Sequence, residues 1–213
     1  MNKPQDIYKE ACVETYAECV LAEQRGANRL ELCSALEHGG LTPSIDLVNK
    51  VLANVNIPTK VMVRARKGNF VYNEAEIKEM EKSIDAFKEA GVHGVVFGFL
   101  TPDNRIDIET TKRLTQLAKP LNVCFHKAID EVEDILEAVE QLCNIPGVDA
   151  ILTSGGEATA MEGQETLRQM LKVADNRLQI VVAGKVLNSN MEELNILIKA
   201  KEYHGRRIVG ELE

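Results

Sequence analysis

The chain has 213 residues, of which 45% are hydrophobic and 27% charged, a composition that is ordinary for one globular domain and excludes long disorder, collagen and a disulfide scaffold. Lys and Arg number 25 against 33 Asp and Glu, and the resulting net charge of −8 disfavours a general nucleic-acid or anionic-membrane surface. Trp is absent and aromatics are 4%, which disfavours stacking on bases.

Short β-like runs alternate with amphipathic helical patterns along the whole chain. Eight strands are predicted, at Glu10–Val13, Arg29–Cys33, Lys60–Arg64, Gly94–Gly98, Asn122–His126, Ala150–Ser154, Gln179–Ala183 and Glu202–Gly205. Their starts lie 19 to 34 residues apart, which is typical of βα units with parallel strands. The pattern predicts a small (β/α)8 TIM barrel as a single domain over residues 1–213. An open doubly wound sheet is the alternative, although no G-x-G-x-x-G follows the first strand.

Helix boundaries carry recognisable signals. Thr42 before Pro43 predicts an N-cap, and Gly26 and Gly91 are placed for helix C-caps. Capping boxes are predicted at Asn73/Glu76, Asp130/Glu133 and Asn190/Glu193. Only residues 206–213 follow the last strand, so the eighth helix is predicted to be missing or truncated. We expect the wall beside that strand to be covered by Met1–Tyr8 or by a second subunit, as in a homodimer.

Polar side chains gather where the strands end, and alternate strand residues point into such a barrel. The residues expected to face the interior are Cys12, Glu14, Arg29, Glu31, Cys33, Met62, Arg64, Arg66, Cys124, His126 and His204. Buried charges need partners, so Glu14, Glu31, Arg64 and Arg66 could form an ion-pair layer that only stabilises the fold. Alternatively they line a pocket, in which Arg64 and Arg66 would bind a carboxylate or phosphate.

Two side chains are candidates for proton transfer. The first is His126, because its ordinary pKa lies near neutrality and it ends a strand; the second is Glu31. Backbone N–H groups in the Gly-rich turn of Ser154 and Gly155 could bind an anion, as could those of the loops after the last two strands. Asp130 is explained as a helix N-cap.

The five cysteines form no CxxC motif. Cys19 and Cys143 are predicted to pack inside helices. Cys12 and Cys33 fall on neighbouring strands, where two thiolates suit Cu(I), although two inert buried thiols are the alternative. The N-terminus has no apolar signal segment and no apolar run reaches membrane-spanning length, so we expect a cytoplasmic protein with reduced thiols.

Several segments, taken together, resemble the CutC copper homeostasis family from Glu10 to Gly210. They are Cys12–Glu14, Gly26–Cys33, Gly39–Ser44, Val61–Tyr72, Gly94–Gly98, Phe125–Asp130 and Ile151–Gly155. The resemblance implies a cytosolic TIM barrel that handles copper, with Cys12 and Cys33 as Cu(I) ligands. The chain departs from the family pattern at Ala65, Lys127 and Ile129, and Lys127 keeps a positive charge without the bidentate fork of arginine.

Two functional hypotheses follow, together with the scaffold alternative in which the polar layer only stabilises the barrel. The first is Cu(I) binding in copper homeostasis. The second is an enzyme or binder for a small anionic metabolite at the mouth of the barrel. The ligand-binding residues predicted for that mouth are Glu14, Glu31, Arg64, Arg66, His126, Lys127, Ser154, Gly155 and His204. Copper ligation does not require these carboxylates and arginines, which is the main reason for the second hypothesis.

Overall fold

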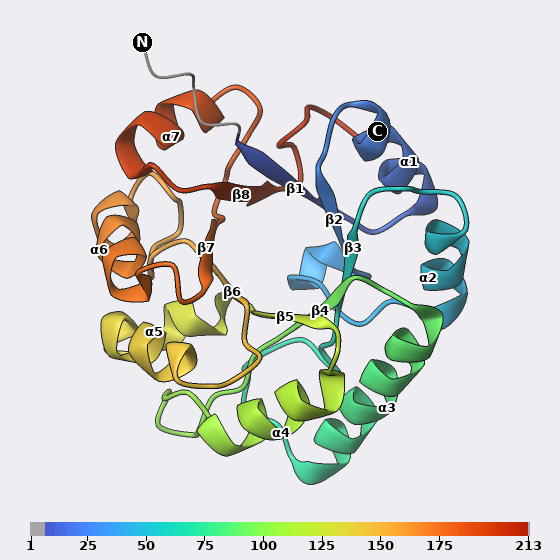
Figure 1. Ribbon diagram of the computed structural model, residues 1–213, viewed down its shortest axis with the longest axis horizontal. Helices are drawn as coiled ribbons and strands as arrows, with labels where there is room; N and C mark the ends of the chain where they lie inside the picture. Colours follow the sequence, from blue (N-terminus) through green and yellow to red (C-terminus); the bar gives the residue numbers. More distant parts are fainter. Residues whose placement is uncertain (1–6, 213) are drawn as a thin grey trace.

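The structure, a computed structural model, describes residues 7–212 and is a closed barrel of eight parallel strands surrounded by helices (Figure 1). The strands are β1 (Tyr8–Val13), β2 (Arg29–Leu32), β3 (Thr59–Met62), β4 (Gly94–Phe97), β5 (Asn122–Phe125), β6 (Ala150–Thr153), β7 (Gln179–Val182) and β8 (Glu202–Gly205). The α-helices are α1 (Tyr16–Gln24), α2 (Ile45–Leu52), α3 (Glu74–Ala90), α4 (Ile108–Ala118), α5 (Ile135–Cys143), α6 (Gln164–Ala174) and α7 (Met191–Ile198). Two short 3-10 helices, η1 (Leu36–His38) and η2 (Lys127–Glu131), follow β2 and β5.

The predicted (β/α)8 barrel is confirmed, and each predicted strand overlaps an observed one. Within the described residues no helix follows β8, as predicted. Several observed strands end one or two residues before the predicted boundary. Cys33, Arg64 and His126 therefore stand just beyond the ends of β2, β3 and β5, at the rim where this fold carries its functional groups.

Helix starts are only partly as predicted. Asn73 caps α3, and with Glu76 it forms the expected capping box. The prediction for Thr42 is wrong, because Ser44 is the N-cap of α2 and accepts a hydrogen bond from the Leu47 N–H. Thr42 instead binds the Arg64 backbone in both directions, so it ties the loop after β2 to the end of β3.

The other two predicted capping boxes are also wrong. The N-cap of α5 is Asp134, not Asp130, whose carboxylate reaches across to the loop after β6. Asn190 precedes α7, but its side chain accepts from the Leu187 N–H, outside the helix. In each case the polar side chain accepts a hydrogen bond from a backbone N–H of a loop instead of from the first turn of the helix. Sequence spacing does not reveal these loop contacts.

Two apolar regions hold the barrel together. A large core fills the space between strands and helices, with Phe87, Leu114 and Tyr203 fully buried in it. A smaller cluster lies inside the barrel and consists of Cys12, Cys33, Met62, Val96, Cys124, Ala150, Leu152, Val181 and Ala183. Most members of the inner cluster are small, and this leaves space inside the barrel near its C-terminal end.

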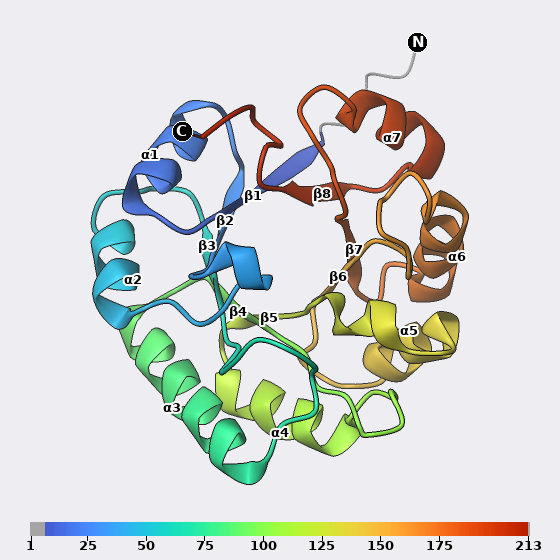
Figure 2. The same ribbon diagram turned by 180° about the vertical axis from the view of Figure 1, so that it is seen from behind.

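The segment after β8 takes part in the core. Ile208 is fully buried, Val209 and Leu212 are 7% exposed, and Leu187 pairs with Arg207 in an isolated bridge. The segment runs beside α1 (Figures 1 and 2). The C-terminal residues therefore contribute to covering this wall. Of the proposed cover Met1–Tyr8, residues 1–6 lie outside the described part, and the second subunit stays a prediction.

No helix between residues 7 and 212 is both long and apolar enough to cross a lipid bilayer.

The packing of the C-terminal segment can be tested by shortening one side chain. Replacement of the buried Ile208 by Ala should cost about 2–4 kcal/mol of unfolding free energy, because it leaves a cavity in the core. Urea denaturation measures this cost. The control is Glu211→Ala on the same segment, which should change stability by less than about 0.5 kcal/mol because the Glu211 side chain is 63% exposed. Equal midpoints for the two variants would show that the segment does not pack as described.

Candidate functional site

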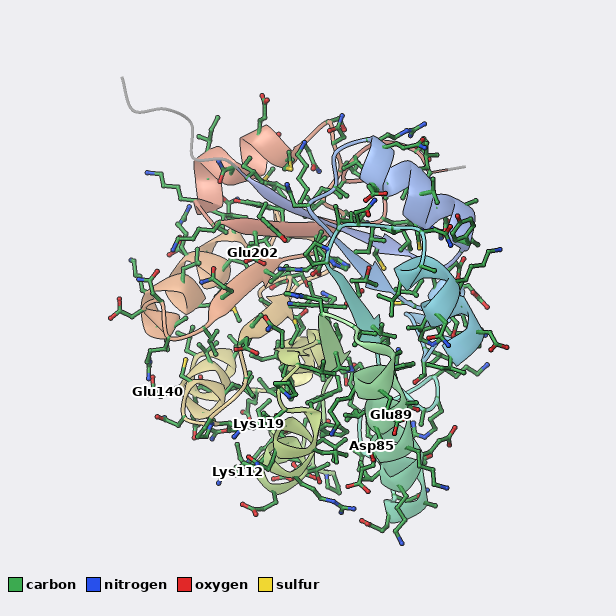
Figure 3. All side chains as sticks on the ribbon, turned by 45° about the vertical axis from the view of Figure 1, so that its right-hand side comes forward. Asp85, Glu89, Lys112, Lys119, Glu140 and Glu202 are labelled. Carbon is green, nitrogen blue, oxygen red and sulfur yellow. The ribbon has the colours of Figure 1, made fainter. Side chains whose placement is uncertain are left out.

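Toward the N-terminal ends of the strands, the polar side chains inside the barrel form an ion-pair network, which is the floor of the site. Glu10 of β1 lies between the two strands that flank it, because β1 pairs with β2 at Arg29 and with β8 at His204. Its carboxylate binds Arg29 Nε on one side and His204 Nδ1, at 2.9 Å, on the other. Arg29 also binds Glu202 at 2.6 Å. Glu202 is labelled in Figure 3 at the start of β8, whereas the other labelled charged residues belong to the outer helices and their ends.

A second layer stands directly above this network. Glu31 Oε2 lies 3.4 Å from Cys12 Sγ, 3.6 Å from Cys33 Sγ and 3.6 Å from His204 Nε2. The donor atoms of Cys12, Glu31 and Cys33 all lie within 4.8 Å of one another, as do those of Glu10, Glu31 and His204. Two neighbouring sets of possible metal ligands therefore share the Glu31 carboxylate.

The protonation of this layer is set by contacts among its members. The hydrogen bond from Cys33, together with His204 and Glu31, lowers the pKa of Cys12 to about 5 against the opposing effect of burial. The same contact and burial raise the pKa of Cys33. Burial raises the pKa of Glu31 to about 8 although His204 opposes it. The pair therefore holds one thiolate at neutral pH, and a metal ion would displace the proton of the other thiol.

A buried arginine and a buried histidine form the opposite, upper wall. Arg64 donates through Nη1 to the carbonyls of residues 38–40 at 3.2–3.4 Å and through Nη2 to the Gly68 carbonyl at 2.8 Å. His126 accepts the Ala128 N–H on Nδ1. Phe70 contacts both, since its ring centroid is 4.8 Å from the Arg64 guanidinium carbon and 4.7 Å from the His126 ring.

The place of His126 depends on a glycine. A Cβ on Gly98, at the end of β4, would lie 2.5 Å from His126 Nδ1, so no other residue leaves room for the ring. Burial and the charge of Arg64 lower the pKa of His126 to about 3. The imidazole is therefore neutral at physiological pH, with its proton on Nε2 because Nδ1 is an acceptor.

These layers enclose a cavity of about 620 Å³ at the C-terminal mouth, within the size range of small-molecule sites. The cavity walls include Cys12, Glu31, Cys33, Met62, Arg64, His126, Lys127 and His204. The short helix η1 lies across the opening (Figure 2), and its Leu36 lines the cavity. The loops after β7 and β8 contribute Gly184, Lys185 and Arg206 to the cavity lining, and the anion binding predicted for these loops stays a prediction.

Four residues predicted at the mouth lie outside the cavity lining, and Arg66 and Glu14 are the first two of them. Arg66 turns outward, where it binds Glu76 at 2.6 Å and carbonyls of its own loop. Glu14 accepts the Leu36 N–H at 2.9 Å and so holds η1. The expected mutual pairing of Glu14, Glu31, Arg64 and Arg66 is therefore wrong, and so is the clamp of two arginines. The strand ends at Met62, so alternation no longer places Arg66 inside.

The turn after β6 is also not available to an anion. The Asp130 carboxylate accepts the N–H groups of Ser154 and Gly156, and Thr153 Oγ1 accepts that of Gly155. Ser154 is fully buried and hydrogen-bonded to Lys127. Lys127 does line the cavity, but its ammonium group is paired with Asp130 at 2.6 Å. The predicted roles of Ser154 and Gly155 as direct anion ligands are thus wrong.

Sequence reasoning gave too little weight to the floor of the site. Glu10 was not a candidate, and neither was Met62, although both share faces with candidates two residues away. His204 was predicted only as a ligand-binding residue of the mouth, but its Nε2 lies 3.6 Å from Glu31 in the thiol layer. The signal that could have found Glu10 is the alternation Glu10-x-Cys12, which puts a carboxylate in the barrel wherever Cys12 faces inward.

The fold and site define a class: a (β/α)8 barrel with a mouth pocket that carries paired thiols beside a carboxylate and a histidine. Residues 7–209 match the model of the CutC family. A CutC family protein of Histophilus somni is 39% identical over 92% of this chain and 80% of its own length. The copper homeostasis protein cutC homolog of Homo sapiens is 38% identical over 92% of this chain and 71% of its own. The chain belongs to the CutC family.

One solved structure agrees with this family assignment, and a second shares only the fold. The crystal structure of CutC from Streptococcus agalactiae superposes with a TM-score of 0.90 at 31% identity and covers 95% of this chain and 100% of its own. An aldolase superposes with a TM-score of 0.70 at 11% identity, covering 97% of this chain and 92% of its own, and shares the fold alone.

Burial of neutral His126 makes a prediction about acid stability. The ordinary pKa of histidine is 6.5, so His126 becomes protonated in the unfolded chain below pH 6.5. In the folded chain its pKa is lowered to about 3, so it becomes protonated only near pH 3. Stability is therefore lost as pH falls through 6.5, by about 2 kcal/mol at pH 5. Urea denaturation at pH 7 and pH 5 should show that His126→Gln loses about 2 kcal/mol less than the wild type.

The control for this measurement is His38→Gln, because the His38 side chain is 41% exposed. It should lose as much stability as the wild type between the two pH values. If His126→Gln behaves like the wild type as well, the histidine is not held neutral in the folded protein.

Proposed function

We propose that this protein binds Cu(I) through the thiolates of Cys12 and Cys33 and serves in copper homeostasis. The observation that carries the proposal is the position of both sulfur atoms, within 4.8 Å of each other, in the wall of a cavity that opens at the barrel mouth. The family relatives in Mus musculus and Homo sapiens are named copper homeostasis proteins.

The donor set suits Cu(I). Thiolate and thioether sulfurs are soft ligands that select this ion, and Met62 lines the same cavity as the two cysteines. Cys12 provides one sulfur already deprotonated at neutral pH, since its pKa is lowered to about 5 by Cys33 and His204. All five cysteines are free thiols, which is typical of a reducing compartment, and the proposal places the protein in the cytoplasm.

The proposal predicts thiol-dependent copper binding. In a competition titration, the fully reduced wild type should bind one Cu(I), and the double variant Cys12→Ser/Cys33→Ser should lose this binding because serine is a hard, protonated donor. The matched control is Cys124→Ser. Cys124 is 1% exposed in the same inner cluster but lies outside the lining of the cavity, so its loss should leave the stoichiometry unchanged.

Two outcomes would contradict the copper assignment. One is binding that persists in the double variant, which would place the ion elsewhere. The other is tighter binding of Zn(II) than of Cu(I) under the same competition, because the set of Cys12, Glu31 and Cys33 also offers donors that zinc uses.

In this proposal His204 joins the two sulfurs as a third donor when the ion binds; without the ion its side chain groups with Glu10 and Glu31 rather than with both sulfurs. Its Nδ1 is held by Glu10 and its Nε2 faces Glu31 beside Cys12, an arrangement in which a carboxylate orients a metal-binding histidine. X-ray absorption at the copper edge should show two sulfurs and one nitrogen in the wild type and two sulfurs alone in His204→Gln. We also expect about tenfold weaker Cu(I) binding in this variant. If copper has only two sulfur ligands in both proteins, His204 is not a copper ligand.

A further inference from the structure

We propose that the upper wall of the cavity binds a small organic oxyanion, a carboxylate or a phosphate group, through Arg64 Nε and His126 Nε2. This site is separate from the copper ligands and does not depend on them. Five buried side-chain polar atoms lack a hydrogen-bond partner within residues 7–212. Three of these belong to residues that line this one cavity, namely Glu31 Oε1, Arg64 Nε and His126 Nε2.

Arg64 brings an uncompensated charge to the wall. The side chain is 6% exposed, and no carboxylate of the described chain forms an ion pair with it. Its four other hydrogen bonds all go to neutral backbone carbonyls, which fix the guanidinium in place without cancelling its charge. A buried cation of this kind costs several kcal/mol unless an anion meets it. The guanidinium plane is fixed and its Nε–H is unpaired; because this nitrogen is buried, an oxyanion would reach it after a small shift of the cavity wall.

His126 adds a second donor of the same kind. Because Nδ1 accepts the Ala128 N–H, the ring proton stands on Nε2, which is buried without an acceptor. Phe70 contacts both the Arg64 guanidinium and the His126 ring, so the two side chains lie close together in the cavity wall. A ligand that brings acceptor oxygens would satisfy both of these donors.

The charged side chains around the cavity are mostly positive, which also favours an anionic ligand. Five Lys and Arg side chains line it against one carboxylate, Glu31, in a protein whose net charge is −8. These cations are Arg64, Lys127, Lys185, Arg206 and Arg207. Lys127, Arg206 and Arg207 already meet carboxylates, whereas Lys185, like Arg64, has no ion pair within the described residues. A local field of this sign concentrates anions at the mouth.

The apolar walls of the cavity indicate the chemistry of the rest of the ligand. Leu36, Met62, Phe70 and Leu152 present apolar surface to the cavity, and the volume of about 620 Å³ exceeds what a simple ion fills. The geometry points to a small metabolite with an apolar or uncharged body and one oxyanion group.

Isothermal titration of the metal-free, reduced protein tests this inference with malonate and with inorganic phosphate, at constant ionic strength in chloride. At least one of the two anions should bind and raise the midpoint temperature of unfolding. Binding of malonate alone would indicate a carboxylate ligand, and binding of phosphate alone would indicate a phosphate ligand. Malonamide, which lacks the charge, should not bind. His126→Phe keeps a ring of similar size but removes the donor, and it should weaken binding about tenfold or more.

Arg64→Met should abolish binding, and where loss of its carbonyl contacts prevents folding, His126→Phe decides alone. The matched control is Arg66→Met, because Arg66 also donates to loop carbonyls but lies outside the cavity. This variant should bind the anion with the affinity of the wild type. Cys12→Ser/Cys33→Ser should bind the anion normally, which separates this result from that of copper. The inference is overturned if neither anion binds below about 10 mM, or if His126→Phe binds like the wild type.

Discussion

The closing contact between β8 and β1 is the constraint on which the site depends. It places His204 opposite Glu10, while β2 places Arg29 on the other side of the same carboxylate. Burial alone would raise the pKa of Glu10, but the hydrogen bond of His204 and the charges of Lys60 and Arg29 hold it well below its usual range. The charged floor is therefore stable only when the barrel is closed, because one partner comes from each neighbouring strand.

The floor in turn fixes the layer above it. His204 is held at Nδ1 by Glu10, so its other nitrogen faces Glu31 and the sulfur of Cys12. Glu31 then has one oxygen among the two sulfurs and His204 and a second oxygen without a partner. A network that is satisfied below and incomplete above is what a built ligand site looks like, since natural cores seldom leave buried polar atoms unpaired without a reason.

The sequence was sufficient for the barrel and for its inward faces. Repeated βα spacing predicted all eight strands, and alternation correctly placed Cys12, Glu31 and Cys33 together. It failed where the chain leaves the strand. Arg66 was assigned by counting in twos from Arg64, but β3 ends at Met62 and the backbone then turns outward.

The loops show a second limit of pattern reasoning. Asp130 has the spacing of a helix cap, and Ser154 the appearance of an anion loop. In the folded chain each satisfies the other, because η2 brings the Asp130 carboxylate to the turn after β6. Such contacts join segments more than twenty residues apart, and no local rule of turn or cap chemistry contains them.

The two halves of the cavity use different residues, and neither half explains the other. Cu(I) bound by Cys12 and Cys33 has no need of a buried arginine, and a cation near the ion would disfavour its binding. An oxyanion held by Arg64 and His126 has no need of paired thiols. A barrel that only stabilised itself would require neither, because an apolar side chain at position 64 would avoid the cost of burying an unpaired charge. The retained charge on the upper wall and the soft donors below are therefore two separate chemical features of one pocket, and each of the two proposals accounts for only one of them.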